Sequence, residues 1–597
     1  MIYNPLNELY KNPVGSVKES EQISFSVKVK QDTCFLLIRQ DEEIEYRRIE
    51  MQKNGDVFSC KITLEVGLFW YTFDLNNGSF IIPNDNLYGV VSNYIREFQL
   101  SVYSKNFVIP SWNSGGIIYQ IFPDRFNRVG NYLDCKRKLH VNTKDTPIYM
   151  PNSMGEVTNE DFFGGNLNGI QEKLSYLSEL GVTAIYLNPI FKSYSNHRYD
   201  TGDYMQIDEV LGSLEDFDQL ISTAKSYNIK IILDGVFNHC GCDSIYFNAK
   251  GNYNSNGAVN SINSPFKKWF QFKEYPNLYE CWWGIKTLPA FEKNCKEYLD
   301  FITGENGVLD YWTKRGVGGW RLDVVDELPQ DFVEKIRERV KSVNKDTILI
   351  GEVWEDASNK IAYGKRRSYF LGKELDSVMN YPLKEAIILS VRNLDLSFLY
   401  KTLREQRDHY SNDVLSNLMN ILSTHDTVRL ITALAGEEIL DKTKQETENL
   451  FIPKNEYKDA IEKVKNATFL QYFLYGVPSV YYGDEAGMQG YKDPLNRRFY
   501  PWGEEDKQLV GWYKKIGKIR RKYEVFKYGR LVDVYCNNNA YVFKRVDETS
   551  ELLFAINLSD TEYKLEFNGS LTNLIDNKSY SNQYLLNKNS RAVFINK

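Results

Sequence analysis

The sequence predicts an α/β protein: a (β/α)8 TIM barrel with an N-terminal β-sandwich, an insertion after the third barrel strand and a C-terminal β domain. Two observations predict this architecture. Between residues 113 and 527, eight short apolar runs alternate with helical patterns, and eight successive β–α units are typical of a closed parallel barrel. Outside this segment, in residues 1–112 and 528–597, strand patterns occur without helices.

Alternating apolar and polar residues predict the N-terminal sandwich. Phe25, Val27 and Val29 alternate with polar neighbours, which is the period of a half-buried strand. Short strands at close spacing, separated by turn residues, are typical of a β-sandwich, and the same signals return near the C-terminus. Further strands are expected at 34–40, 57–64 and 68–75 in the first domain, and at 540–545, 552–558, 563–567 and 592–595 in the last.

The barrel strands are expected at short apolar runs followed by amphipathic helices. The aliphatic residues between 167 and 180 fall on one helical face, and Ser213 and Asp216 have the spacing of a capping box. The predicted strands are 117–122, 182–188, 229–234, 319–324, 348–353, 377–381, 419–423 and 478–482. They extend over about 365 residues, more than the ~250 typical of this fold. The aromatic and Asn-rich segment of about 240–291 is therefore interpreted as an insertion.

Composition narrows the choice of partner. The chain has 73 Lys and Arg against 79 Asp and Glu, a net charge of -6, which argues against a nucleic-acid partner and suits a neutral substrate. Aromatic residues make up 14%, and aromatic faces pack against sugar rings. No apolar run approaches the ~20 residues of a membrane span, and the first residues lack a signal-peptide pattern. With eight scattered cysteines, we expect reduced thiols and a cytoplasmic protein.

Three carboxylates end predicted barrel strands, and active sites of this fold lie where the strands end. Asp323, Glu352 and Asp426 follow the fourth, fifth and seventh strands. A charged group in an apolar strand is costly unless it is paired or used. Any one of them could be a structural ion pair or cap, but their collection at one end of one barrel favours catalysis.

The neighbours of these carboxylates predict unequal proton affinities. Arg321 lies two residues before Asp323 on the same strand face and should lower its pKa. Trp354 stands in the same relation to Glu352, and an apolar wall raises a carboxyl pKa. One ionised and one protonated carboxyl group is the arrangement that glycoside hydrolysis needs.

Three of the five histidines lie at the same end of the predicted barrel. His239 and His425 end strands, and His197 lies just beyond the second strand. A neutral imidazole can donate a hydrogen bond to a sugar hydroxyl. We assign no role in the predicted site to His140 or His409.

These motifs together resemble glycoside hydrolase family 13, the α-amylase family, and within it the neopullulanase, cyclomaltodextrinase and maltogenic amylase group. The resemblance covers nearly the whole chain, including an N-terminal domain similar to a starch-binding module. Each motif alone is a weak pattern, but four in order on the expected strands are specific. They are DGVFNH at 234–239, GWRLDV at 319–324, GEVW at 351–354 and STHD at 423–426.

The resemblance implies a retaining mechanism and assigns roles. Asp323 would be the nucleophile, Glu352 the acid and then base, and Asp426 the carboxylate that binds sugar hydroxyls. Tyr199 would stack on the same sugar, and Trp354 would line the leaving-group side, with Trp282 or Trp283 as a further candidate there. The remaining implied substrate-binding residues are His197, His239, Arg321, His425, Asp493 and Arg497.

The resemblance also raises a structural calcium site, which the sequence does not favour. The corresponding loop reads NRVGNYLD at 127–134, and Asn166 follows Gly165 where an Asp is common. Exchange of Asp for Asn removes a charge from a hard-cation site. We therefore expect no required cofactor and no metal ligand.

The leading hypothesis is a hydrolase of α-1,4-glucans: cyclodextrins, maltooligosaccharides and, as a further candidate, pullulan. Two alternatives remain open at this point: a transglycosylase on the same substrates, and a non-catalytic glucan-binding protein on the same scaffold. The group also implies a homodimer formed through the N-terminal domain. Linkage preference and the ratio of hydrolysis to transfer are not encoded in these motifs.

Overall fold

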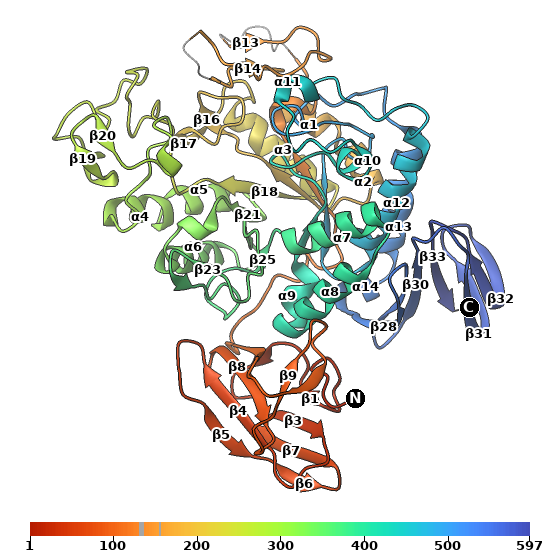
Figure 1. The fold of residues 1–597 in the computed structure, drawn as a ribbon. Helices are drawn as coiled ribbons and strands as arrows, with labels where there is room; N and C mark the ends of the chain where they lie inside the picture. The colour runs from red at the N-terminus through yellow and green to blue at the C-terminus, as the bar shows by residue number, and fades with distance from the viewer. Residues whose placement is uncertain (131–136, 154–156, 597) are drawn as a thin grey trace.

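The computed structural model describes residues 1–130, 137–153 and 157–596. A β-sandwich, a central barrel and a C-terminal sheet follow one another along the chain (Figure 1). The sandwich lies below the barrel in this view and the C-terminal sheet lies beside it. No helix in the described ranges combines the length and apolar character that a bilayer crossing requires.

The N-terminal domain packs two sheets around one apolar core. Phe25, Val27, Leu36 and Phe73 are among its buried residues, and the predicted alternation of apolar and polar positions in the first strand is confirmed. One sheet has the order β1 (Lys11–Asn12), β3 (Ile23–Lys28), β7 (Val57–Ile62) and β6 (Gln52–Asn54). The other contains β2 (Val17–Lys18), β4 (Phe35–Gln40), β5 (Arg47–Glu50), β8 (Gly67–Asp74), β9 (Phe80–Pro83), β10 (Gly89–Ser92) and β11 (Phe98–Tyr103).

All eight predicted barrel strands form one parallel sheet. In chain order they are β12 (Ile118–Ile121), β15 (Ala184–Leu187), β18 (Lys230–Gly235), β21 (Gly319–Leu322), β22 (Ile348–Gly351), β25 (Ser377–Val378), β26 (Met419–Ile421) and β27 (Val477–Tyr481). The sheet order runs β25-β22-β21-β18-β15-β12-β27-β26. A parallel bridge between Met379 and Met419 joins its two ends, so the barrel closes.

The helices between the strands match the amphipathic patterns with one difference. The capping box predicted at Ser213 and Asp216 begins α3 (Leu214–Ser226). The apolar stripe of 167–180 is buried as expected, but the helix is broken at Lys173 into α1 (Leu167–Glu172) and α2 (Leu174–Glu179), because Lys173 leaves helical geometry at ψ 4°. Further helices are α4 (Lys296–Thr303), α5 (Val308–Lys314), α6 (Gln330–Val343), α7 (Tyr381–Asn393), α8 (Ser397–His409), α9 (Asn412–Asn417), α10 (Leu430–Ala435), α11 (Lys444–Thr447), α12 (Tyr457–Phe473), α13 (Lys507–Lys522) and α14 (Val525–Tyr528).

The segment after β18 contains short hydrogen-bonded pieces in place of a regular helix. Strands β19 (Phe272–Glu274) and β20 (Leu278–Tyr279) pair within it. Many of its aromatic rings are core: Trp269 stacks on Tyr246, and Phe291 stacks on Tyr298 at a ring distance of 4.1 Å. Part of the aromatic excess thus holds this segment against the barrel and is not available to sugars.

The C-terminal domain is a six-stranded antiparallel sheet. The four predicted strands are present as β29 (Ala540–Val546), β30 (Glu551–Asn557), β31 (Tyr563–Asn573) and β33 (Ser590–Asn596). Two more, β28 (Arg530–Cys536) and β32 (Lys578–Leu586), were not predicted. Strand β32 is mostly polar and exposed, and β28 is apolar but does not alternate between buried and exposed positions. The cysteines of the described residues form no disulfide.

Candidate active site

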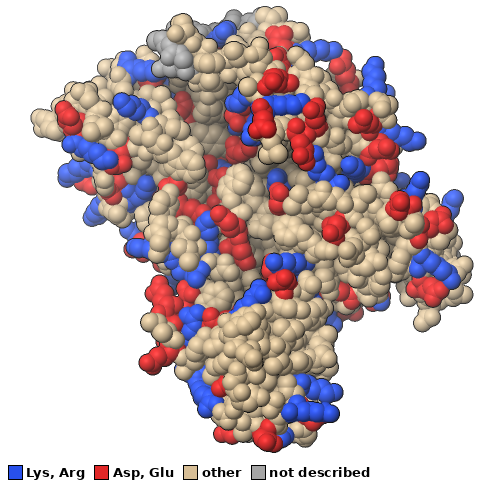
Figure 2. Space-filling view, in the orientation of Figure 1, with Lys and Arg blue, Asp and Glu red and all other residues tan. Residues whose placement is uncertain are grey.

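A cleft of about 1270 Å³ opens at the C-terminal end of the barrel strands. Figure 2 shows a hollow in this face of the molecule with acidic side chains along it. Every predicted site residue except Arg321 lines the cleft, and Arg321 lies fully buried beneath it. The lining site residues are His197, Tyr199, His239, Asp323, Glu352, Trp354, His425, Asp426, Asp493 and Arg497.

Arg321, on strand β21, joins three carboxylates at the floor of the cleft. Its Nη1 atom donates to Asp323 Oδ1 at 2.8 Å and to Asp234 Oδ1 at 2.9 Å, while Nη2 pairs with Glu352 Oε2 at 2.9 Å. Arg321 and Asp323 point the same way from one strand, as their two-residue spacing predicts. Asp323 and Glu352 are therefore neighbours across a single guanidinium group.

Arg321 lowers the pKa of Asp323, as expected, but the net shift of this pKa is upward and the expected low value is wrong. Burial raises the pKa of Asp323 well above its ordinary value, and the Glu352 and Asp234 carboxylates add to the rise, against the opposing effect of Arg321. The physical reason is stoichiometric: one guanidinium is divided among three acids, so it does not compensate the desolvation of each.

Glu352 is held by hydrogen bonds where the sequence suggested an apolar wall. The Trp354 indole Nε1 donates to Glu352 Oε1 at 3.2 Å, and the Val324 backbone N–H donates to Oε2 at 2.8 Å. Trp354 itself stacks on Tyr381 with ring centres 3.9 Å apart. Val324 adopts a left-handed backbone (φ 38°, ψ 52°), which is strained for a β-branched residue and is here used to aim an amide at Glu352.

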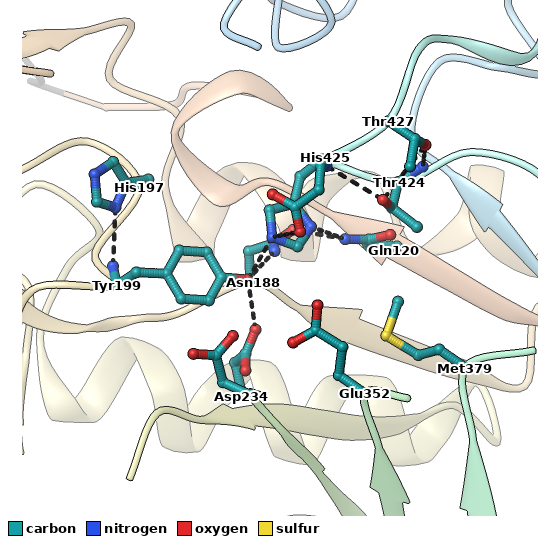
Figure 3. Close-up of polar contacts among 12 residues, drawn as sticks. Gln120, Asn188, His197, Tyr199, Asp234, Glu352, Met379, Thr424, His425 and Thr427 are labelled. Atoms are coloured by element: carbon teal, nitrogen blue, oxygen red, sulfur yellow. Dashed lines mark hydrogen bonds and ion pairs between the residues drawn. The ribbon is translucent and has the colours of Figure 1, made fainter. Parts of the chain in front are cut away.

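Tyr199 and His425 meet in one hydrogen-bond network (Figure 3). The Tyr199 hydroxyl donates to Asp234 Oδ2 at 2.8 Å and lies 2.7 Å from His425 Nε2. Gln120 Nε2 can only donate, so His425 Nδ1 accepts its hydrogen bond and the neutral ring carries its proton on Nε2. Burial, and then the Arg497 and Arg321 charges, lower the pKa of His425 well below its ordinary value, which agrees with a neutral ring.

His197 and His239 are neutral rings as well. Burial lowers the pKa of each to about 4. His197 Nδ1 accepts the backbone N–H of Tyr199 at 3.1 Å, which fixes the loop between β16 (Phe191–Ser193) and β17 (Thr201–Ile207). His239 stacks on Trp282, and its Nε2 atom has no hydrogen-bond partner among the described residues.

Asp426 lies against His425 and Arg497 beyond strand β26. Its Oδ2 is 3.1 Å from His425 Nε2, and its Oδ1 accepts from Arg497 Nη2 at 3.3 Å. Burial raises the pKa of Asp426 to about 6, with Glu352 and Asp493 adding to the rise and Arg497 opposing it. Arg497 Nε also donates to the His425 carbonyl oxygen at 2.9 Å, so Arg497 ties this carboxylate to its strand.

Trp282 and Trp283 both line the cleft from the insertion. Their rings stack 5.4 Å apart, and the Trp283 indole donates to Glu327 Oε1 at 3.1 Å. Trp283 is 77% exposed, so its outer face is free, whereas Trp282 is covered by His239 on one side.

The sequence interpretation missed four residues that hold the site together. Asp234 was seen at a strand end but not selected, and it accepts hydrogen bonds from the hydroxyls of Tyr199 and Tyr186, the latter at 2.6 Å. Asn188 Nδ2 donates to the Tyr199 hydroxyl at 2.9 Å, and Gln120 bridges Asn188 and His425. For Gln120 and Asn188 the available signal was an uncharged polar residue in an otherwise apolar predicted strand, which is costly unless it is hydrogen-bonded.

The candidate calcium loop is only partly described, since residues 131–136 lie outside the described ranges. Asn166 caps α1 by accepting from Gly169 N and donates to the Val129 carbonyl, while Asn127 Nδ2 donates to the Gly169 carbonyl. The side-chain amides of Asn127 and Asn166 thus form hydrogen bonds with backbone groups. Within the described residues no group of three His, Cys, Asp or Glu side chains is arranged to hold a metal ion.

Comparisons with known proteins agree with this geometry. The model of the α-amylase catalytic domain matches residues 120–522. A cyclomaltodextrinase from Thermoanaerobacter pseudethanolicus is 32% identical over 471 residues, which cover 76% of this chain and 72% of that protein. An amylopullulanase from Thermoanaerobacter thermohydrosulfuricus is 34% identical over 604 residues, covering 90% of this chain and 40% of the relative.

A solved structure named cyclomaltodextrinase has the same fold, with a TM-score of 0.71 at 22% identity over 99% of both chains. The chain spans less than half the length of the amylopullulanases that it matches. The matched segment begins in the first barrel strand and contains all of the cleft residues named above as predicted site residues. The chain therefore belongs to the α-amylase family of glycoside hydrolases.

Proposed function

We propose that this chain hydrolyses α-1,4-glucosidic bonds in cyclodextrins and maltooligosaccharides through a covalent glycosyl-enzyme on Asp323. The observation that carries the proposal is the sharing of one buried guanidinium by Asp323 and Glu352 within the cleft. Two adjacent carboxyl groups around one bond are what retaining glycoside hydrolysis needs. The names of the relatives, cyclomaltodextrinase and amylopullulanase, support α-glucans as the substrate class.

In the first step, the free oxygen of Asp323 attacks the anomeric carbon while Glu352 gives its proton to the departing glycosidic oxygen. Arg321 keeps Asp323 Oδ1 in place, so the attack is assigned to Oδ2. The Trp354 and Val324 N–H groups orient the Glu352 carboxyl group toward the leaving oxygen. The products of this step are a glycosyl ester on Asp323, an ionised Glu352 and the released sugar.

In the second step, Glu352 removes a proton from water, the water oxygen attacks the anomeric carbon, and the ester bond to Asp323 breaks. Asp426, Tyr199, His239 and His425 are assigned to the sugar that carries the reacting carbon, because they line the same cleft as Asp323 from loops beside the barrel strands. Neutral histidines can donate to hydroxyls without competing for the proton of Glu352.

The test compares parent and Asp323→Asn on β-cyclodextrin, pullulan and soluble starch, with products separated by chain length. We expect the parent to cleave β-cyclodextrin and the variant to lose at least about 10³-fold in kcat/KM. A variant as active as the parent refutes covalent catalysis on Asp323, and a parent that binds but cleaves nothing supports the non-catalytic alternative. The ratio of released glucose to products longer than maltotriose, with maltotriose as substrate, measures hydrolysis relative to transglycosylation.

We also propose that two copies associate through the N-terminal sandwich. Its β10 edge and the following turn expose Val91, Tyr94 and Ile95, at 50%, 65% and 43% of their surface. Sedimentation of the parent and of Val91→Glu tests this: the parent should run as a dimer that the charge weakens, and a monomeric parent refutes it.

A further inference from the structure

A small hairpin follows Glu352 and borders the cleft. Strands β23 (Ile361–Ala362) and β24 (Lys365–Arg366) pair antiparallel across a two-residue turn at Tyr363 and Gly364. Both turn residues have positive φ, 50° and 74°, which is typical of a tight type I′ hairpin turn. The tip therefore has a defined shape, and its position depends on what holds the base.

The tip presents apolar surface to the cleft. Ile361, Ala362 and Tyr363 line it, and Tyr363 is 70% exposed. Burial and then the Glu327 carboxylate raise the pKa of Tyr363 to about 12, and the same Glu327 accepts the Trp283 indole hydrogen. The hairpin tip and the insertion thus approach one another at Glu327 and leave two aromatic rings open toward a ligand.

The base of the hairpin is fixed to the N-terminal sandwich of the same chain. Arg366 forms a two-pronged ion pair with Asp41, with Nε to Oδ2 at 2.8 Å and Nη2 to Oδ1 at 3.1 Å. Trp70 Nε1 donates to Asp41 Oδ1 at 2.7 Å, so the carboxylate cannot rotate freely. Both charged side chains are largely covered, at 22% and 15% exposure, which makes this pair stronger than an open surface bridge.

A second attachment lies just before the hairpin. Gln99, on strand β11 and 3% exposed, donates to Ser358 Oγ at 2.9 Å and accepts from Asn359 Nδ2 at 2.7 Å. The sandwich therefore holds the segment 358–366 at two points, one on each side of the residues that face the cleft. A contact that served only to dock two domains would not need to flank these residues.

We propose that the N-terminal sandwich positions this hairpin so that Tyr363 and Ile361 form a platform for sugar units on the leaving-group side, with Asp41 and Arg366 as positioning residues. The inference rests on the proposed role of Glu352 as the acid. Glu352 delivers its proton to the leaving oxygen, so the loop that continues from it faces the leaving sugars. Aromatic and aliphatic side chains supply the flat apolar contact that a sugar face prefers.

The experiment measures kcat and KM of Asp41→Asn and Arg366→Gln on two substrates, 4-nitrophenyl α-maltoside and maltohexaose. The aryl leaving group is too short to cover the platform, whereas maltohexaose can extend over it. For both variants we expect KM for maltohexaose to rise about five- to tenfold, with kcat/KM for the aryl substrate within about twofold of the parent. Arg366→Lys keeps the charge but not the two-pronged geometry, so its KM for maltohexaose should lie between that of the parent and that of Arg366→Gln.

Three controls separate positioning from general loosening. Tyr363→Ala removes no contact between the domains and should also raise KM for maltohexaose without affecting the aryl substrate. It therefore tests the platform even if an ion-pair variant fails to fold. The double variant of Asp41→Asn and Arg366→Gln should be no worse than either single one, because both remove the same contact. Arg48→Gln removes an exposed ion pair with Asp74 inside the sandwich and should leave kcat and KM unchanged on both substrates.

Equal losses on both substrates, or a Tyr363→Ala variant with the KM of the parent for maltohexaose, overturn the inference. A parent that cleaves neither substrate overturns the proposed function instead, so the two failures are distinguishable.

Discussion

The two ends of the cleft are built in different ways. At the proposed reacting end, Arg321 and Asp234 come from barrel strands, His425 follows one, and Tyr199 comes from the loop before β17. These four residues are connected by hydrogen bonds of 2.7–2.9 Å. At the leaving-group end, exposed side chains come from loops, and a separate domain holds one of those loops. Under the proposed function, residues on or beside the barrel sheet carry the chemistry, and loops contact the leaving sugars.

The largest expected effect lies at the reacting end. Glu352→Gln keeps the size of the side chain and one oxygen that can accept from Trp354 or Val324, but it removes the acidic proton. We therefore expect kcat/KM on maltohexaose to fall about 10³-fold. On 4-nitrophenyl α-maltoside, whose leaving group needs little protonation, formation of the glycosyl-enzyme should be much less affected. Burst kinetics with the aryl substrate measure this step. Equal losses on both substrates would contradict the role of Glu352 as acid.

A smaller effect is expected from the network around the reacting sugar. Tyr199→Phe removes the hydroxyl that serves Asp234, Asn188 and His425, leaving a buried carboxylate short of one donor. A lost bond of this kind costs about 1–3 kcal/mol, so kcat/KM should fall about tenfold or more on every substrate. The loss should not depend on the leaving group, in contrast to that of Tyr363→Ala. A loss that depends on the leaving group would contradict the assignment of Tyr199 to the reacting end of the cleft.

The pH profile reports on the charges of the reacting end. The proposed mechanism needs ionised Asp323 and Asp426, and burial raises the pKa of both, that of Asp426 to about 6. As pH falls through this value the carboxylate is protonated, so kcat/KM should fall about tenfold per unit on the acid side. Arg497→Gln removes a cation that opposes the rise and should move this limb to higher pH. An acid limb near the ordinary Asp range would show that neither group controls the rate.

The smallest effect is on stability. Because the pKa of Asp323 is raised in the folded protein, folding favours its protonated form, and its contribution to stability falls as pH rises above the ordinary Asp range. Asp323→Asn should therefore raise Tm by about 2 °C at pH 7, with the gain shrinking as pH is lowered. Calorimetry of both proteins at several pH values measures this. A lower Tm of the variant at pH 7 would contradict this prediction and would show that the ion pair of Asp323 with Arg321 stabilises the fold by more than the burial of Asp323 costs.

The same contrast explains what could be predicted from sequence. Barrel strands are short, apolar and buried, so their pattern located all eight, and Asp323, Glu352 and Asp426 follow directly from their ends. Strand spacing also placed Arg321 beside Asp323. The sign of the pKa shift of Asp323 could not be predicted, because it depends first on how deeply the carboxyl group is buried and then on Glu352 and Asp234, which come from other strands.

The leaving-group end could not be predicted for a related reason. Nothing local in the sequence connects Asp41 with Arg366, since the contact joins residues that are 325 positions apart. Tyr363 and Gly364 form a turn whose strands are only two residues long, too short for any periodicity to appear. Trp354 was expected as an apolar wall, yet its indole N–H binds Glu352, and a sequence does not indicate which edge of a ring faces a neighbour.

The crowding of three acids around Arg321 has a consequence for inhibitors. With Asp426 and Arg497 included, the cleft and its floor hold more carboxylates than guanidinium groups. As a glycosidic bond breaks, positive charge develops on the ring oxygen and anomeric carbon, and it meets a negative field that is already oriented. A sugar mimic with a protonated ring nitrogen should thus bind more tightly than a neutral mimic of the same shape, and should lose that advantage where its amine is uncharged.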